Sequence, residues 1–128
     1  MVNLAKALLN VQKEIGAIAK DSKNPFFKSS YLSLNGVREA VLPVLSKYNV
    51  VLLQPTVYSE GRTFVCTRLI HSESGEVMES MTEVVTSKAG DAQNFGSGLS
   101  YSRQYGLMSI LCLAAEDDDA NVASGKTV

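Results

Sequence analysis

The sequence predicts an α+β fold in which two helices precede a three-stranded antiparallel β-meander and a long helix follows it. Two observations predict this order. Apolar residues recur at helical spacing in two segments of the first 48 residues. Three segments rich in β-branched and aromatic residues follow between residues 50 and 86, and the third alternates sharply between apolar and polar positions. The chain has 128 residues, enough for one domain. We therefore expect one core domain at residues 1–115 and a flexible acidic tail at 116–128.

Two amphipathic helices are predicted in the N-terminal part. The first follows Asn3, a suitable N-cap. The second begins near Ser33 or Asn35 and reaches Tyr48, because its period continues beyond Pro43 although an interior proline costs roughly 3 kcal/mol. The apolar stripe of the first helix comprises Leu4, Ala7, Leu8, Val11, Ile15 and Ile18, and that of the second Val37, Ala40, Val41, Val44, Leu45 and Tyr48.

Three strands are predicted next, at Val50–Val57, Arg62–His71 and Glu76–Thr86. All three are rich in β-branched and aromatic residues. The two connectors between them are short and polar and end in Gly61 and Gly75, as tight hairpins require. The strands should therefore form an antiparallel meander.

A long helix is predicted from about Ala92 to Ala115, with Asp91 as its N-cap. Helical glycines cost up to ~1 kcal/mol each, so small residues at four-residue spacing indicate a helix that packs closely on its neighbour. Three such residues form one stripe: Gly98, Ser102 and Gly106. The helix also carries more apolar surface than one small chain can cover, which predicts a homo-oligomer.

The net charge of −1 is unevenly distributed. Residues 1–49 carry seven basic and three acidic residues, whereas residues 50–115 carry four and six, and the tail one and four. A phosphate backbone responds to the local field rather than to the total charge. Nucleic acid therefore stays open as a partner, despite the overall acidity.

Several classes of function are disfavoured by what the sequence contains. It has two cysteines and one histidine, which argues against structural zinc and a disulfide framework and predicts reduced thiols in the cytoplasm. No apolar run has the length of a membrane helix, and the N-terminus lacks a signal-peptide pattern. We expect no membrane association.

No catalytic pattern is recognisable: HExxH, a nucleophile elbow and a dinucleotide fingerprint are all missing from the sequence. Residues 125–127, Gly-Lys-Thr, imitate a phosphate-binding loop, but Ala120 stands where that loop needs glycine. The acidic run at 116–119 lacks the spacing of a calcium loop and is typical of a solvated tail. We expect a binding protein rather than an enzyme, without cofactor or metal.

Lysines and aromatic residues are interleaved between Lys23 and Tyr31, a segment that also holds Lys28. Proteins that bind single strands use this composition, with cations for phosphates and rings for base faces. The alternative is a solvated loop whose Phe26 and Phe27 fold back into the core.

The long helix holds a second group of candidate residues. Arg103 lies one turn from both Leu99 and Leu107. It is either presented to phosphate or a neighbouring subunit, or it is held in a buried ion pair or packed along apolar surface. Tyr101 and Tyr105 lie four residues apart and are either core or interface aromatics or a platform for bases.

Two segments resemble a known family. Residues 96–107, GSGLSYSRQYGL, and residues 113–121, LAAEDDDAN, resemble the signature of the Erf (essential recombination function) family of phage single-strand annealing proteins. That signature reads roughly G-S-x-x-T-Y-x-R-R-Y-x-L, followed by an acidic D-D-D-x-N ending. The likeness covers about residues 3–121, with weaker matches at 31–34 and from Pro43 through Lys47 to Gln54.

The resemblance implies an ATP-independent protein that binds single-stranded DNA and anneals complementary strands in phage homologous recombination. It implies self-assembly into rings or filaments, a location in the host bacterial cytoplasm, and a β-β-β-α core similar to that of eukaryotic Rad-type annealing mediators. A phage exonuclease or a host single-strand-binding protein are expected as further partners. The alternatives are a single-strand-binding or scaffold protein without annealing activity, and a metal-dependent nuclease that uses Asp117, Asp118 and Asp119.

Residue by residue, Tyr101, Arg103 and Tyr105 match the family's Tyr, first Arg and second Tyr. Gln104 stands where the family usually has a second Arg, which removes one cation. Together with the cationic segments, this gives the expected DNA contacts: Lys23, Lys28, Tyr31, Lys88, Tyr101, Arg103, Gln104 and Tyr105.

Overall fold

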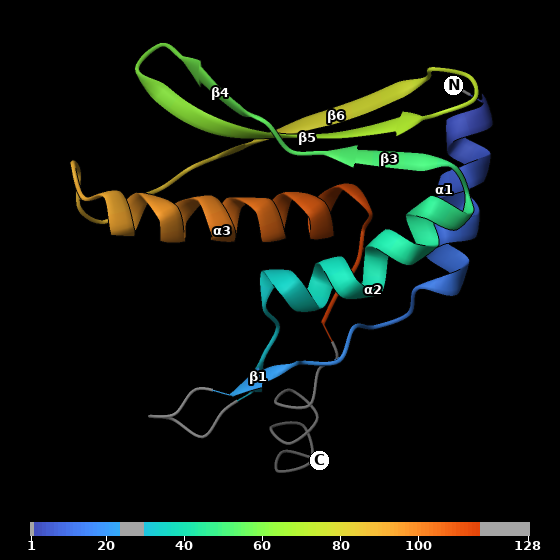
Figure 1. Cartoon of the computed structure of the whole chain (residues 1–128), viewed down its shortest axis with the longest axis horizontal. Helices are drawn as coiled ribbons and strands as arrows, with labels where there is room; N and C mark the ends of the chain where they lie inside the picture. The colour runs from blue at the N-terminus through green and yellow to red at the C-terminus, as the bar shows by residue number, and fades with distance from the viewer. Residues whose placement is uncertain (1, 24–29, 116–128) are drawn as a thin grey trace, which may run out of the picture.

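The computed structural model describes residues 2–23 and 30–115 (Figure 1). These residues form an α+β fold with antiparallel sheets, as the sequence predicts. The elements are α1 (Val2–Glu14), β1 (Ser22–Lys23), β2 (Ser30–Tyr31), α2 (Leu34–Lys47), β3 (Val50–Leu53), β4 (Thr56–Ser59), β5 (Arg62–His71), β6 (Val77–Glu83) and α3 (Ala92–Ile110). The expected acidic tail at 116–128 lies outside the described residues.

Strand β5 is the centre of the main sheet. It pairs with β6 along one side and, along the other, with β3 and then β4. The prediction of one continuous strand at 50–57 is therefore wrong, because the chain is interrupted at Gln54 and Pro55. Pro55 has no N–H to donate to a ladder, and only its carbonyl is bonded, accepting from the N–H of Cys66 at 2.8 Å.

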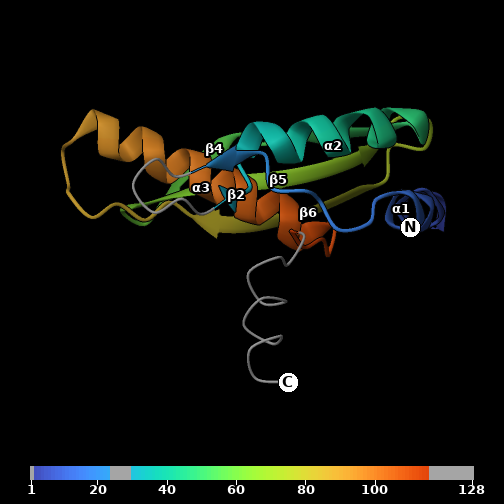
Figure 2. The ribbon, with the colours of Figure 1, turned by 90° about the horizontal axis from the view of Figure 1, so that it is seen from below.

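Helices α2 and α3 lie on one face of this sheet, and α1 stands at the end of the sheet (Figure 1). Helix α3 packs on β5 and β6, α2 packs on β3 and on α3, and α1 packs on α2 and β5. Seen from below, α2 and α3 lie side by side beneath the sheet (Figure 2). The core is enclosed between the helices and the sheet.

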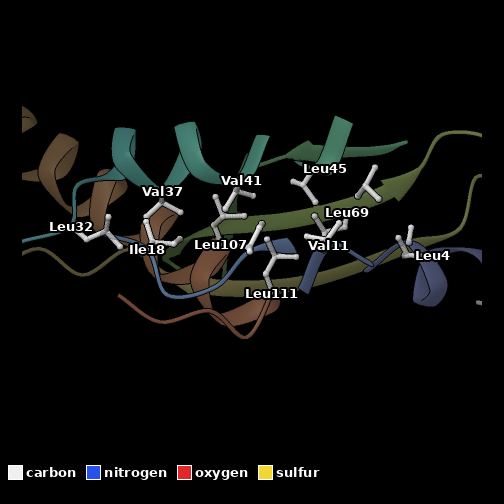
Figure 3. Close-up of a cluster of buried hydrophobic side chains, with 13 residues drawn as sticks. Leu4, Val11, Ile18, Leu32, Val37, Val41, Leu45, Leu69, Leu107 and Leu111 are labelled. Carbon is white, nitrogen blue, oxygen red and sulfur yellow. The ribbon is translucent and has the colours of Figure 1, made fainter. Parts of the chain in front are cut away.

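Buried side chains from every helix and from β5 meet in that core (Figure 3). The predicted stripe of α2 is confirmed, with Ser33 as the N-cap and Pro43 inside the helix. The fully buried members are Leu4, Val11, Val37, Val41, Leu45, Leu69, Leu107 and Leu111.

The predicted extent of the first helix is wrong. Helix α1 ends at Glu14, although Ile15 and Ile18 of the predicted stripe are still buried. Gly16 follows the last turn, and glycine weakens a helix. Ile18 instead donates its N–H to the carbonyl of Ala114 at 3.1 Å, in a parallel bridge with the segment after α3.

The opposite face of the main sheet is covered by no helix or strand among residues 2–23 and 30–115 (Figure 1). Residues that pair directly across strands share a face, so Leu53, Arg68 and Glu79 lie on one side of the sheet. We call this side the open face. Its exposed large apolar side chains are Val51, Leu53, Val77 and Met81.

Close packing of α3 on the sheet is confirmed. Ser102 donates from Oγ to the carbonyl of Glu83 at 3.0 Å. A Cβ at Gly98 would lie 2.8 Å from the carbonyl oxygen of Val85, and one at Gly106 would lie 2.6 Å from Oγ1 of Thr67. The helix ends at Ile110 rather than Ala115.

We expect Gly98→Ala to destabilise the fold by about 1–3 kcal/mol, because its methyl group would overlap a backbone carbonyl that cannot move aside. Gly96→Ala is the matched control. Nothing lies within 4 Å of a Cβ at Gly96, so alanine should stabilise α3 by up to ~1 kcal/mol. Chemical denaturation of both variants measures the difference. Equal stabilisation by the two alanines would contradict the close approach of α3 to the sheet.

Candidate nucleic-acid interface

Helix α3 presents its two kinds of candidate residue on opposite flanks. The stripe of Gly98, Ser102 and Gly106 is buried against the sheet. Each residue turns the helix by about 100°, so Tyr101 and Arg103, the neighbours of Ser102, point to opposite sides of that stripe. The structure therefore divides the predicted site into separate surfaces.

The tyrosine flank lies next to β6. Tyr101 and Tyr105 are each 60% exposed, and their rings stack with centroids 6.2 Å apart and an interplanar angle of 13°. With Val85 and Gly98 they line a groove of about 470 Å³. Such exposure is incompatible with core aromatics. An interface and a platform for bases stay open as interpretations.

The arginine flank lies next to α2 and the end of β3. Arg103 is half-buried and shares a cleft of about 380 Å³ with Arg38 of α2. Within residues 2–23 and 30–115, no carboxylate forms an ion pair with either guanidinium. The described residues therefore do not support the interpretation that Arg103 is held in a buried ion pair. Arg38 is not among the contacts expected from the sequence.

Gln54 fixes α3 at the position of Arg103. Its Nε2 donates to the backbone carbonyl of Arg103 at 2.9 Å and to Oγ1 of Thr67 at 3.0 Å. Gln54 follows Leu53 of the open face, so its side chain lies on the opposite, helix side of the sheet, where it joins the sheet to α3. Gln54 thus positions Arg103 at the rim of the cleft that both residues line.

Gln104 occupies a third side of α3. Its Nε2 donates to the backbone carbonyl of Leu32 at 2.8 Å, and the contact is partly buried. The residue that stands in place of the family's second Arg therefore tethers the segment before α2 to α3. A DNA contact by Gln104 stays a prediction.

The remaining predicted contacts lie on other elements. Lys23 and Tyr31 belong to the two-stranded sheet β1–β2, and both are exposed. Lys88 is exposed in the segment before α3, where its N–H donates to Oδ1 of Asn94 at 3.3 Å. Lys28 lies outside the described residues, as do Phe26 and Phe27.

A carboxylate anchors the β1–β2 segment to α2. Oδ1 of Asp21 accepts from the N–H of Ser33 at 2.8 Å, and Oδ2 accepts from its hydroxyl at 2.5 Å. These hydrogen bonds from Ser33 hold the pKa of Asp21 below its usual value. Ser33 in turn caps α2, so the segment that carries Lys23 and Tyr31 is joined to the helix that carries Arg38.

The arginines of the open face differ from those of the cleft, because each arginine of the open face already forms an ion pair with a carboxylate. Arg62 binds Glu83 through two hydrogen bonds of 2.8 and 2.9 Å, and Arg68 binds Glu79 at 2.8 Å. The Arg62 guanidinium keeps the pKa of Glu83 below its usual value. The guanidiniums of Arg38 and Arg103, in contrast, are unpaired among the described residues. We call the cleft that they share the arginine cleft; its leucines are Leu34, Leu42 and Leu52.

The described part of the chain contains no group of three His, Cys, Asp or Glu residues placed to hold a metal ion. The acidic run at 116–119, which the sequence reasoning considered for metal binding or nuclease activity, lies outside that part. None of the described helices is both long and apolar enough to cross a membrane.

Exposed stacked rings on α3, together with unpaired guanidiniums on α3 and on the neighbouring α2, are typical of proteins that bind nucleic acid. A model of the ERF superfamily matches residues 4–127, nearly the whole chain. The chain belongs to the ERF superfamily, a family of phage single-strand annealing and recombination proteins. No curated protein and no solved structure matches the chain.

Proposed function

We propose that this protein binds single-stranded DNA and anneals complementary strands without nucleotide hydrolysis, in phage homologous recombination. The observation that carries the proposal is membership of the ERF superfamily over residues 4–127. We extend the proposal to the fold. The order of β3 to β6 followed by α3 would correspond to the core of eukaryotic Rad-type annealing mediators.

The two flanks of α3 suit the two parts of a single strand. Unpaired bases offer flat faces to exposed rings, and stacking is worth ~1–3 kcal/mol per base. Tyr101 and Tyr105 offer such rings. The charged backbone needs cationic side chains that no carboxylate already neutralises. Arg103 is such a side chain among the described residues. In this proposal the tyrosines bind bases and Arg103 binds phosphate.

Annealing needs no chemical step once a strand is held with its Watson–Crick edges free. A complementary strand is then tested by base pairing alone, so the proposed activity is not enzymatic. Repetition of weak contacts along one strand raises the overall affinity without any new contact in a subunit. This is how a slightly acidic chain can bind a polyanion.

Self-association supplies that repetition, and the open face is the surface we propose for it. Leu53 and Met81 are 44% and 49% exposed there, in a sheet face that no described element covers. The charges beside them are already paired, so the face is close to neutral. Apolar surface of this kind on a small chain marks interaction sites.

We expect the purified protein to form a homo-oligomer at micromolar concentration, as measured by light scattering. Met81→Glu should lower its mass, because a charge would enter the apolar contact. Leu9→Glu is the control, since Leu9 is an equally exposed leucine on α1, away from the open face. A wild-type mass of one chain would contradict self-association, and equal effects of both variants would contradict the choice of surface.

We expect tighter binding to single-stranded DNA than to duplex of equal length, with little dependence on sequence. Rings stack on unpaired bases, whereas reading a duplex requires side chains in its grooves. Affinity should fall steeply with salt, because phosphate contacts release counterions. Fluorescence anisotropy with oligo-thymidine and with a duplex measures both effects. Equal affinities, or binding that salt does not change, would count against the proposed function.

A further inference from the structure

The arginine cleft contains two like charges and no described opposite charge. Arg38 comes from α2 and Arg103 from α3, and both line the same cleft of about 380 Å³. Two cations that share a confined site repel each other, and the repulsion grows as water is displaced. An anion in the cleft would offset that repulsion. The cleft lies within the ~300–1,000 Å³ range of small-ligand sites.

The chemistry of the lining narrows the class of anion. A guanidinium presents a planar fork of donors that matches phosphate oxygens, and two guanidiniums can hold one phosphate from two sides. The other walls include Leu34, Leu42 and Leu52. Apolar walls suit the carbon framework of a sugar better than a second charged group. Phosphate joined to sugar is the repeating unit of a nucleic-acid backbone.

We propose that Arg38 and Arg103 together bind one backbone phosphate of single-stranded DNA in this cleft, with the adjoining sugar against the leucines. This inference rests on the proposed function. It adds Arg38, a residue of α2, to the contacts expected from α3. The two arginines stand on rigid elements, because α2 packs on α3 and Gln54 ties α3 to the sheet. Such support keeps a binding site in its productive geometry.

Binding of labelled oligo-thymidine to Arg38→Ala, Arg103→Ala and the double variant tests the inference. Each single variant should weaken binding about 10- to 150-fold, the effect expected for the loss of a hydrogen bond to a charged group. The double variant should lose less than the product of the two single losses, because both side chains act on one phosphate. Lys13→Ala, which removes an equal charge from exposed α1, should change binding by less than about twofold.

Two further measurements sharpen the test. The first uses a strand whose phosphodiesters are replaced by uncharged methylphosphonates. The wild-type protein and Arg38→Ala should bind this strand with similar, weak affinity. Poly-glutamate should bind the wild-type protein no better than it binds Arg38→Ala. If the binding of poly-glutamate depends on Arg38 and the binding of oligo-thymidine does not, the cleft binds acidic protein segments and the inference is overturned.

The inference and the proposed function can fail separately. If the wild-type protein binds oligo-thymidine and Arg38→Ala behaves like Lys13→Ala, the two-arginine site is wrong and single-strand binding stands. If the single losses multiply in the double variant, the arginines act on different phosphates and the shared site is wrong. If the wild-type protein does not bind oligo-thymidine, the proposed function fails first.

Discussion

Arg103→Ala should weaken the binding of single-stranded DNA by roughly 1–3 kcal/mol, uniformly across sequences, and leave the fold intact. The slope of log affinity against log salt should fall by about 0.7, the contribution of one phosphate contact to a single strand. The reason is that Arg103 lies in a cleft where no described carboxylate neutralises it. A salt titration and a thermal melt of the same variant measure both quantities.

The melt distinguishes this account from a structural role for Arg103. Removing one partner of a buried ion pair costs roughly 3–5 kcal/mol of stability. Loss of the packed stem of an unpaired arginine should cost about 1 kcal/mol or less. A large drop in melting temperature with an unchanged salt slope would show that Arg103 supports the fold and does not contact DNA.

Replacing both Tyr101 and Tyr105 by alanine should weaken single-strand binding by about 2–6 kcal/mol if each ring stacks on one base. Both rings are largely exposed, so stability should change little. Anisotropy with oligo-thymidine measures the loss. The salt slope should stay close to that of the wild-type protein, because rings carry no charge.

Replacement of the same two residues by phenylalanine is the control, since it keeps the rings and removes only the hydroxyls. The phenylalanine variant should bind within a few-fold of the wild-type protein. If the alanine variant instead has the wild-type affinity per subunit but a lower oligomeric mass, the tyrosines form a subunit interface. That result would restore the other interpretation of these two residues.

Local signals in the sequence were sufficient to predict the extent of α2 and the start of α3. Asp91 caps α3 as predicted, Ser33, near which the second helix was expected to begin, caps α2, and Pro43 is accommodated on an exposed side of α2.

The end of α1 was missed although Gly16 follows it, because the apolar stripe continues through Ile15 and Ile18. Ile18 is buried where its backbone forms a bridge with Ala115. In the sequence, this buried position looks like one more turn of the apolar stripe of α1.

The break between β3 and β4 carried a signal that was not used, because Pro55 stands inside the predicted strand. The break lies beside the candidate site. Gln54 directly precedes Pro55 and bonds to the backbone carbonyl of Arg103, a contact that no sequence pattern predicts.

Arg38 could have been found from spacing. It lies four residues from both Leu34 and Leu42, in the same arrangement that drew attention to Arg103. That the two arginines share a cleft depends on α2 and α3 lying side by side (Figure 2). Such packing of helices far apart in the sequence becomes visible only in the structure.

The division of the signature residues into two flanks follows from helical geometry once one face is known to be buried. Gly98, Ser102 and Gly106 indicated that face in the sequence. Which flank meets α2 and which meets β6 was not readable, because it depends on the path of the chain around the sheet. In the proposed function, this separation would place bases and phosphates on different sides of α3.

The rate at which two complementary oligonucleotides anneal, with EDTA present and nucleotide absent, shows whether the protein is an annealing protein. Fluorescence transfer between labels on the two strands reports duplex formation. We expect the wild-type protein to anneal them faster than they pair spontaneously, with both strands at full length, and we expect Arg103→Ala to reduce the acceleration. Binding without acceleration would identify a single-strand-binding or scaffold protein, and shortened strands that appear only with a divalent metal would identify a nuclease. Either result would contradict the proposed annealing function.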